Sequence, residues 1–129
     1  MRALDSIRQV DYTVIFARDM QRMRDFYGNT LGFRIIRELG PQWVEYAVGS
    51  NVIALTQRGM MFDDPAPPVG ALSLQLAFRV SPPDVARCAD ELTSAGVSLL
   101  GPPADQPWHH RTLFFRDPDG NVLEIYAEI

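Results

Sequence analysis

Residues 120–126, GNVLEIY, nearly repeat residues 50–56, SNVIALT, and this repeat is the feature that decides the fold. Each run is rich in β-branched and apolar residues and follows a turn signal, which predicts a strand. Similar predicted elements precede both runs, which indicates that the chain contains an internal repeat of one structural unit. The copies differ in charge at one position, where Glu124 of the second matches Ala54 of the first. This difference bears on function, because a carboxylate supports chemistry that a methyl group cannot.

The first copy has the pattern of a strand, a helix and three further strands. Its first strand lies within residues 10–19, and apolar residues at helical spacing predict a helix over residues 20–31. Asp19 is the expected N-cap of this helix and Gly32 its end. The three strands that follow are predicted at residues 33–39, 42–48 and 51–57.

The second copy repeats this order. A strand is predicted at residues 72–80 and a helix at 81–97, with Ser81 and Asp84 as a capping box and Gly96 at its end. Three strands are then expected at residues 98–101, 111–117 and 121–127, with the DPDG turn joining the last two. The pattern predicts an α+β fold.

We therefore interpret residues 1–129 as a single domain with an internal repeat. Module one spans residues 7–57, a proline-rich linker spans 58–71, and module two spans 72–129. Neither half would bury the face of its sheet well alone, so we expect the halves to pack together or across a dimer.

The composition excludes some classes of protein. The net charge of −4 argues against nucleic-acid binding, which requires a basic surface. The single cysteine, Cys88, excludes an internal disulfide, suits a reducing compartment and is interpreted as a packing residue. The chain shows no signal-peptide pattern and no apolar run of membrane-spanning length, so we expect a cytoplasmic protein with no membrane partner.

Alternation along the last two strands sorts their side chains onto two faces. One face is uniformly apolar and is expected to pack against helices; it comprises Leu113, Phe115, Leu123 and Ile125. The other is mixed polar and aromatic, as in the lining of a ligand cleft or on a solvated outer face. This second face carries His110, Thr112, Phe114, Val122, Glu124 and Tyr126. Gln75 is expected to point toward the same cavity as Glu124.

Two segments of the chain resemble the vicinal oxygen chelate superfamily, which includes glyoxalase I, extradiol dioxygenases, fosfomycin resistance proteins and bleomycin resistance proteins. Residues 10–35, VDYTVIFARDMQRMRDFYGNTLGFRI, are similar to the family's opening strand and helix, and residues 107–126, PWHHRTLFFRDPDGNVLEIY, to its closing hairpin. The resemblance implies two βαβββ modules that form a curled, half-open mixed sheet, the glyoxalase-like fold. It also implies a homodimer.

Metal-using members of this superfamily hold a divalent ion through up to four positions, which fall here on Tyr12, Ala54, Gln75 and Glu124. Ala54 offers no donor, and Tyr12 coordinates only as a phenolate. Gln75 offers a neutral amide oxygen, so Glu124 is the one strong donor. His110 shares the face of Glu124 and would complete a non-standard three-ligand site if it lies within reach. The cofactor expectation is therefore a divalent ion (Ni, Mn, Zn or Fe) or none.

One functional hypothesis is a metal-free binding protein of the glyoxalase and bleomycin resistance kind. Tyr12, Trp108, Phe114 and Tyr126 would supply stacking surfaces, and the carboxylate of Glu124 together with the acidic balance suits a cationic guest. The candidate ligand-binding residues are Tyr12, Gln75, Trp108, His110, Thr112, Phe114 and Tyr126. Trp43 is a further candidate for the same surface, or else a core residue.

The alternative is a divalent-metal-dependent lyase, isomerase or other enzyme of the same superfamily. It would use Glu124, Gln75 and His110, with Glu124 as the candidate catalytic residue and general base, because burial among aromatic rings raises the pKa of a carboxyl. A purely structural or regulatory module is the third possibility. The partner expected in the first two cases is a small-molecule ligand or substrate.

Overall fold

The computed structural model describes residues 2–129. These residues belong to two compact units, the first ending at Asp64 and the second beginning at Pro65. This boundary falls inside the segment 58–71 that the sequence predicts as a linker. No helix in the described part of the chain is both long enough and apolar enough to cross a membrane.

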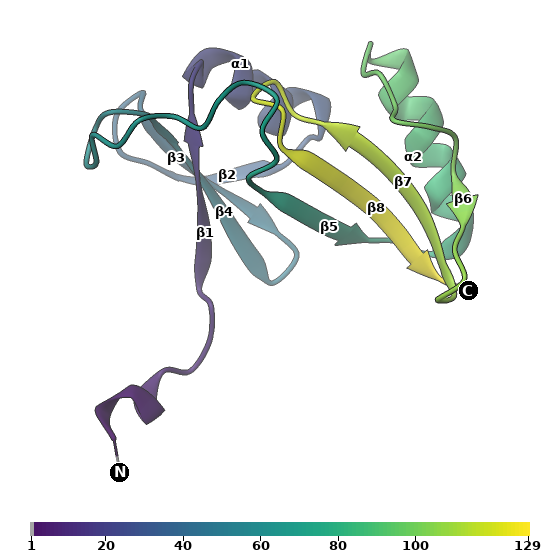
Figure 1. Ribbon diagram of the computed structural model, residues 1–129, viewed down its shortest axis with the longest axis horizontal. Helices are drawn as coiled ribbons and strands as arrows, with labels where there is room; N and C mark the ends of the chain where they lie inside the picture. The colour runs from purple at the N-terminus through teal and green to yellow at the C-terminus, as the bar shows by residue number, and fades with distance from the viewer. Residues whose placement is uncertain (1) are drawn as a thin grey trace. The chain divides into compact units, whose positions relative to one another are not determined.

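The first unit contains a four-stranded sheet with the strand order β1-β4-β3-β2 (Figure 1). Its elements are η1 (Ala3–Ser6), β1 (Tyr12–Ala17), α1 (Met20–Asp25), η2 (Phe26–Thr30), β2 (Arg34–Glu38), β3 (Trp43–Val48) and β4 (Asn51–Gln57). Strand β1 pairs parallel with β4, and the other neighbours pair antiparallel. The helix therefore carries the chain from one sheet edge, β1, to the other, β2.

The second unit repeats this topology with the strand order β5-β8-β7-β6. Its elements are β5 (Gln75–Arg79), α2 (Pro82–Ser94), β6 (Ala104–Asp105), β7 (His110–Arg116) and β8 (Val122–Glu128). Strand β5 pairs parallel with β8, and β7 pairs antiparallel with both β6 and β8. The predicted α+β class and the repeated βαβββ order are confirmed.

The structure differs from the sequence interpretation at two elements. The predicted strand at residues 98–101 is an isolated bridge from Leu99 to Phe115, and the first strand after α2 is the two-residue β6 instead. The first helix also changes from α1 to the π-helical turn η2 at Phe26. Prolines at 102 and 103 explain the first difference, because proline cannot donate to a strand ladder.

The helix boundaries follow from local chemistry. The side chain of Asp19 accepts a hydrogen bond from the backbone N–H of Arg22 at 3.1 Å and so caps α1. Ser81 is the N-cap of α2, but its side chain makes no capping hydrogen bond, so the predicted capping box is not formed. Gly96 follows α2 with φ of +84°, a left-handed conformation that ends the helix.

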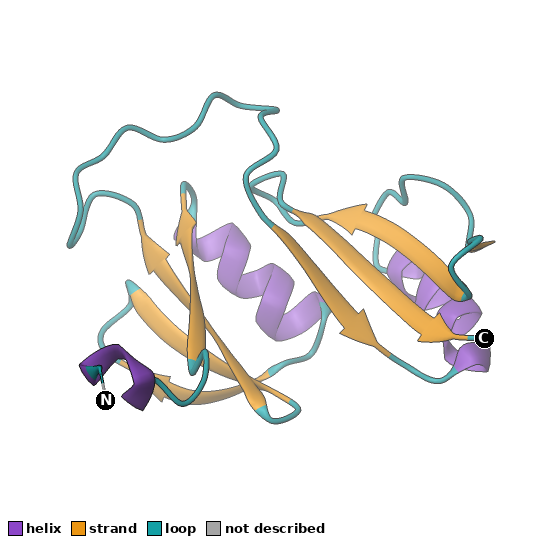
Figure 2. Ribbon diagram, turned by 60° about the horizontal axis from the view of Figure 1, so that its bottom comes forward, coloured by secondary structure: helices purple, strands orange, loops and turns teal. Residues whose placement is uncertain are grey.

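A helix lies along one face of each sheet (Figure 2) and buries one alternating set of strand residues. In the first unit this buried set is Ile15, Ala17, Val44, Tyr46, Ile53 and Leu55. In the second unit it is Leu113, Phe115, Leu123, Ile125 and Ala127, which includes the apolar face predicted from alternation. The remaining alternate residues therefore stand on the face of each sheet that its helix does not cover.

Candidate functional site

The uncovered face of the first sheet is aromatic where three strands meet. Phe16 of β1 and Trp43 of β3 both pair in register with Thr56 of β4, so the three side chains form one row across the sheet. The next row contains Val14, Ala54 and Glu45. Ala54 is fully buried in this row and offers only a methyl group.

A sharp turn after β4 brings more apolar side chains to this face. The backbone N–H of Arg58 donates to the carbonyl of Ala17 at 2.9 Å and extends the β1–β4 ladder by one residue. Gly59 then has φ of +82°, a conformation that residues with a Cβ rarely adopt. The following residues 60–62, Met-Met-Phe, are exposed and line the pocket.

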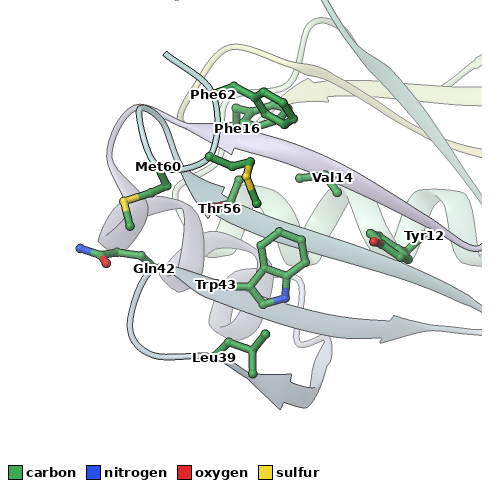
Figure 3. A pocket seen from close by; sticks show the side chains of 10 residues that line it. Tyr12, Val14, Phe16, Leu39, Gln42, Trp43, Thr56, Met60 and Phe62 are labelled. Atoms are coloured by element: carbon green, nitrogen blue, oxygen red, sulfur yellow. The ribbon is translucent and has the colours of Figure 1, made fainter. Parts of the chain in front are cut away.

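Together these elements enclose an apolar pocket of about 600 Å³ (Figure 3). Its lining consists of Tyr12, Val14, Phe16, Leu39, Gln42, Trp43, Thr56, Met60, Met61 and Phe62. This volume lies within the range of about 300–1,000 Å³ that is typical of small-molecule sites. The pocket lies entirely within the first unit.

The aromatic rings of the pocket are held by specific contacts. The Tyr12 and Trp43 rings meet edge to face with centroids 6.4 Å apart, and the Phe16 and Phe62 rings do so at 6.3 Å. The indole N–H of Trp43 donates to the Glu45 carboxylate at 2.8 Å. Glu45 therefore fixes the orientation of the indole ring, and Phe62 fixes the 60–62 segment against β1.

In the second unit, the structure brings Gln75 and Glu124 together. The Gln75 side-chain amide donates to the Glu124 carboxylate at 3.1 Å. Glu124 is half-buried and pairs in register with Ala77 on one side and Phe114 on the other. This is the mixed polar and aromatic face that alternation predicts.

Tyr126 is the centre of a second cluster on this face. The His110 ring stacks on it with a centroid distance of 4.6 Å, and the Arg79 guanidinium lies 5.7 Å from its ring centroid. Arg79 also forms an ion pair with Glu128. The rings of His110 and Tyr126 therefore contact each other, and the Tyr126 ring also contacts Arg79.

The remaining predicted residues of this unit lie near the β6–β7 edge. Thr112 is buried, and its hydroxyl accepts a hydrogen bond from the Gln106 side chain at 2.9 Å. Trp108 is 59% exposed. The neighbouring Arg111 donates to Asp105 at 2.7 Å, and this hydrogen bond lowers the pKa of the Asp105 carboxyl.

The residues present do not fit a divalent metal ion. Within residues 2–129 no group of three or more His, Cys, Asp and Glu side chains is placed to hold one. His110 lies four residues along β7 from Phe114, the register partner of Glu124, which is about 13 Å of strand. The second unit thus offers Gln75 and Glu124 alone, and Ala54 offers no donor in the first.

Several residues of the apolar pocket were not predicted from the sequence, among them Phe16, Leu39 and the segment 60–62, nor was Glu45, which orients Trp43. Two signals pointed to them. Alternation along residues 12–17 and 43–48 places Phe16 and Glu45 on the faces of Tyr12 and Trp43. The apolar run after Gly59 is unusual in a linker.

Comparisons with curated proteins find relatives of similar length. The chain is 28% identical to the virulence protein STM3117 of Salmonella typhimurium over 92% of this chain and 83% of that protein. It is 31% identical to the Escherichia coli protein YaeR, covering 95% of this chain and 98% of that protein. These values indicate common descent over nearly the whole chain.

Solved structures share the fold. A glyoxalase/bleomycin resistance protein/dioxygenase from Nocardioides matches with a TM-score of 0.82 at 21% identity, over 96% of this chain and 85% of that one. The fosfomycin resistance protein FosX of Mesorhizobium loti matches with a TM-score of 0.71 at 18% identity, covering 95% of this chain and 94% of that one. The family model of the same superfamily matches residues 9–125. The chain therefore belongs to the glyoxalase/bleomycin resistance protein/dioxygenase superfamily.

Proposed function

We propose that this protein binds a small molecule with a flat apolar body in the pocket of its first unit, without a resident metal ion. The observation that carries this proposal is the pocket of about 600 Å³, in which aromatic and methionine side chains predominate. Methionine side chains are flexible and polarisable, so they adapt to ligands of different shape. The pocket is therefore suited to binding rather than to acid–base chemistry.

The site residues predicted from the sequence divide between the two units. Tyr12 and the further candidate Trp43 line the pocket, whereas the other predicted ligand-binding residues belong to the second unit. Phe114 and Tyr126 supply aromatic surface to its mixed face, and Gln75, Thr112 and His110 supply polar groups. We propose that these residues, together with the exposed ring of Trp108, form a separate ligand-contact surface within the second unit, where the buried Thr112 positions Gln106 rather than touching the ligand.

The experiment is a titration with N-phenyl-1-naphthylamine, a neutral dye whose fluorescence rises in an apolar site. We expect saturable binding of one dye per chain with micromolar affinity. Leu39→Ala and Phe62→Ala should each weaken binding by about tenfold, because each removes apolar surface from the pocket wall.

Leu100→Ala is the matched control. Leu39 is 56% exposed and Leu100 is 54% exposed, but Leu100 is absent from the pocket lining. The control should bind the dye as the wild type does. Absence of saturable binding, or equal affinity in all three variants, would contradict the proposal.

An enzyme that uses Glu124 is the second candidate. The observation in its favour is the hydrogen bond of 3.1 Å between Gln75 and Glu124, which holds a half-buried carboxylate in the middle of a mixed face. Such a carboxylate, oriented by an amide, suits a general base. The metal titration of the Glu124 variant given in the Discussion tests the metal-dependent form of this candidate.

We further propose that the protein is a homodimer. The N-terminal arm, residues 2–11, is exposed along its whole length and extends away from β1 (Figure 1). Leu4, Ile7 and Val10 are large apolar side chains of this arm that lie in solvent. A second copy of the chain is the partner that would cover them, in line with dimers elsewhere in the superfamily.

A further inference from the structure

A second cavity adjoins the apolar pocket of the first unit. It has a volume of about 270 Å³ and is lined by Phe16, Arg58, Gly59, Phe62 and Asp64. Phe16 and Phe62 line both cavities, so this aromatic pair is their common wall. The smaller cavity differs from the larger one because it contains two charged side chains.

Arg58 is held rigidly at this cavity. Its backbone continues the β1–β4 ladder through the hydrogen bond to the Ala17 carbonyl. Its guanidinium carbon lies 5.9 Å from the Phe16 ring centroid, in a cation–π contact. The side chain is only partly exposed. The positive charge is therefore placed beside the apolar pocket before any ligand arrives.

The charge of Arg58 lacks a counter-ion among residues 2–129. Its Nε–H is shielded from water and has no hydrogen-bond acceptor there. Five other arginines form ion pairs with carboxylates: Arg24, Arg37, Arg79, Arg87 and Arg111. An unpaired guanidinium in a partly buried site favours an anion, because its planar donors match carboxylate and sulfonate oxygens.

We propose that the occupant of this site is an amphipathic organic anion, with a planar apolar body in the larger pocket and a carboxylate or sulfonate group against Arg58. This inference rests on the proposed function, since it names the ligand class of the same pocket. The net charge of the chain led us to expect a cationic ligand, whereas this inference predicts an anionic one. The charge of Arg58 beside the pocket outweighs the charges of distant side chains, because those are screened by salt.

The carboxylate of Asp64 opposes the binding of an anion in this cavity. It lines the same cavity, yet within residues 2–129 it forms no ion pair with Arg58. A ligand anion therefore meets one attractive and one repulsive charge. Asp64→Asn removes the repulsive one and should tighten binding of an anion about twofold to fivefold.

The experiment compares two dyes that share one scaffold. N-Phenyl-1-naphthylamine is neutral, and 8-anilinonaphthalene-1-sulfonate carries a sulfonate on the same rings. The wild type should bind the sulfonate more tightly than the neutral dye, and added salt should weaken only the sulfonate. Arg58→Gln should weaken the sulfonate by about tenfold and change the affinity for the neutral dye by less than twofold.

The neutral dye also reports whether each variant keeps its pocket. If Arg58→Gln leaves sulfonate binding unchanged, or weakens both dyes equally, the assignment of Arg58 to an anion is wrong while the pocket proposal stands. If the wild type binds neither dye, the pocket proposal fails, and this inference fails with it. A sulfonate affinity unchanged in Asp64→Asn would count against the anion lying in the smaller cavity.

Discussion

At the scale of single residues, Ala54 and Glu45 decide whether the uncovered face of the first sheet offers a carboxylate that could bind a metal ion. They are cross-strand partners on the same face, so a carboxylate stands one strand away from the position where the superfamily can place a ligand. Glu45, however, accepts the hydrogen bond of the Trp43 indole and lies 3.5 Å from Arg37. The Glu45 carboxylate therefore orients an aromatic ring that lines the apolar pocket.

The first prediction at this scale concerns metal ions at Glu124. Chelator-stripped protein titrated with Ni²⁺, Mn²⁺, Zn²⁺ or Fe²⁺ should show no saturable rise in Tm, because Gln75 and Glu124 alone hold such ions weakly. A specific ion at about 100 times its Kd would add about 2.7 kcal/mol to the free energy of unfolding. Thermal unfolding measures this directly.

Glu128→Ala is the control for this titration, because Glu128 lies on the same strand and face as Glu124. A saturable rise in Tm that persists in Glu128→Ala and disappears in Glu124→Ala would overturn the metal-free proposal. His110 would then be the next residue to substitute, since it is the one imidazole on that face.

At the scale of elements, the N-caps of α1 and α2 allow a direct comparison of a helix start with and without a side-chain hydrogen bond. The Asp19 side chain accepts a hydrogen bond at the start of α1, whereas the Ser81 side chain makes none at the start of α2. Asp19→Ala should therefore lower the free energy of unfolding by about 1 kcal/mol, and Ser81→Ala by less than about 0.5 kcal/mol. Urea unfolding monitored by circular dichroism distinguishes the two. Equal losses would mean that capping does not explain these helix starts.

The segment 60–62 is the other element on which the proposed ligand binding depends. Gly59 turns the chain, and the Phe16–Phe62 contact holds the segment over the sheet. A residue with a Cβ at position 59 would be strained at its positive φ. The wall of the pocket is thus made by a short loop of adaptable side chains on a rigid sheet, an arrangement common in binding sites.

At the scale of the whole molecule, the N-terminal arm carries a prediction about assembly. Deletion of residues 2–10 removes the three exposed apolar side chains Leu4, Ile7 and Val10. If a second copy covers them, the deletion should weaken the dimer by at least about a hundredfold, since each such side chain contributes about 1.5–3 kcal/mol when buried. Sedimentation equilibrium of both proteins measures the dimer Kd.

Leu100→Ser serves as the control for this comparison, because it changes an equally exposed leucine outside the arm. A dimer of unchanged affinity after the deletion would show that the arm is not part of the interface. A monomeric wild type would contradict the homodimer itself. The family match begins at residue 9, so most of the arm lies outside it.

The repeated βαβββ order, the cap at Asp19 and the sorting of strand residues onto two faces could all be predicted from the sequence. These features depend on short-range chemistry: side-chain hydrogen bonds within one turn, glycine at positive φ, and the period of two along a strand. The approach of Gln75 to Glu124 was expected from alternation in a sheet curled from both halves, and in the structure it results from the pairing of β5 with β8 within the second unit.

Tertiary structure alone decided the apolar pocket and the charge beside it. The pocket joins side chains from β1, β3, β4 and the segment 60–62, and which of them meet depends on strand register and on the turn at Gly59. The lack of a carboxylate partner for Arg58 among residues 2–129 is likewise decided by the fold. Alternation assigns a residue to a face, but only the register across strands decides which side chains share a cavity.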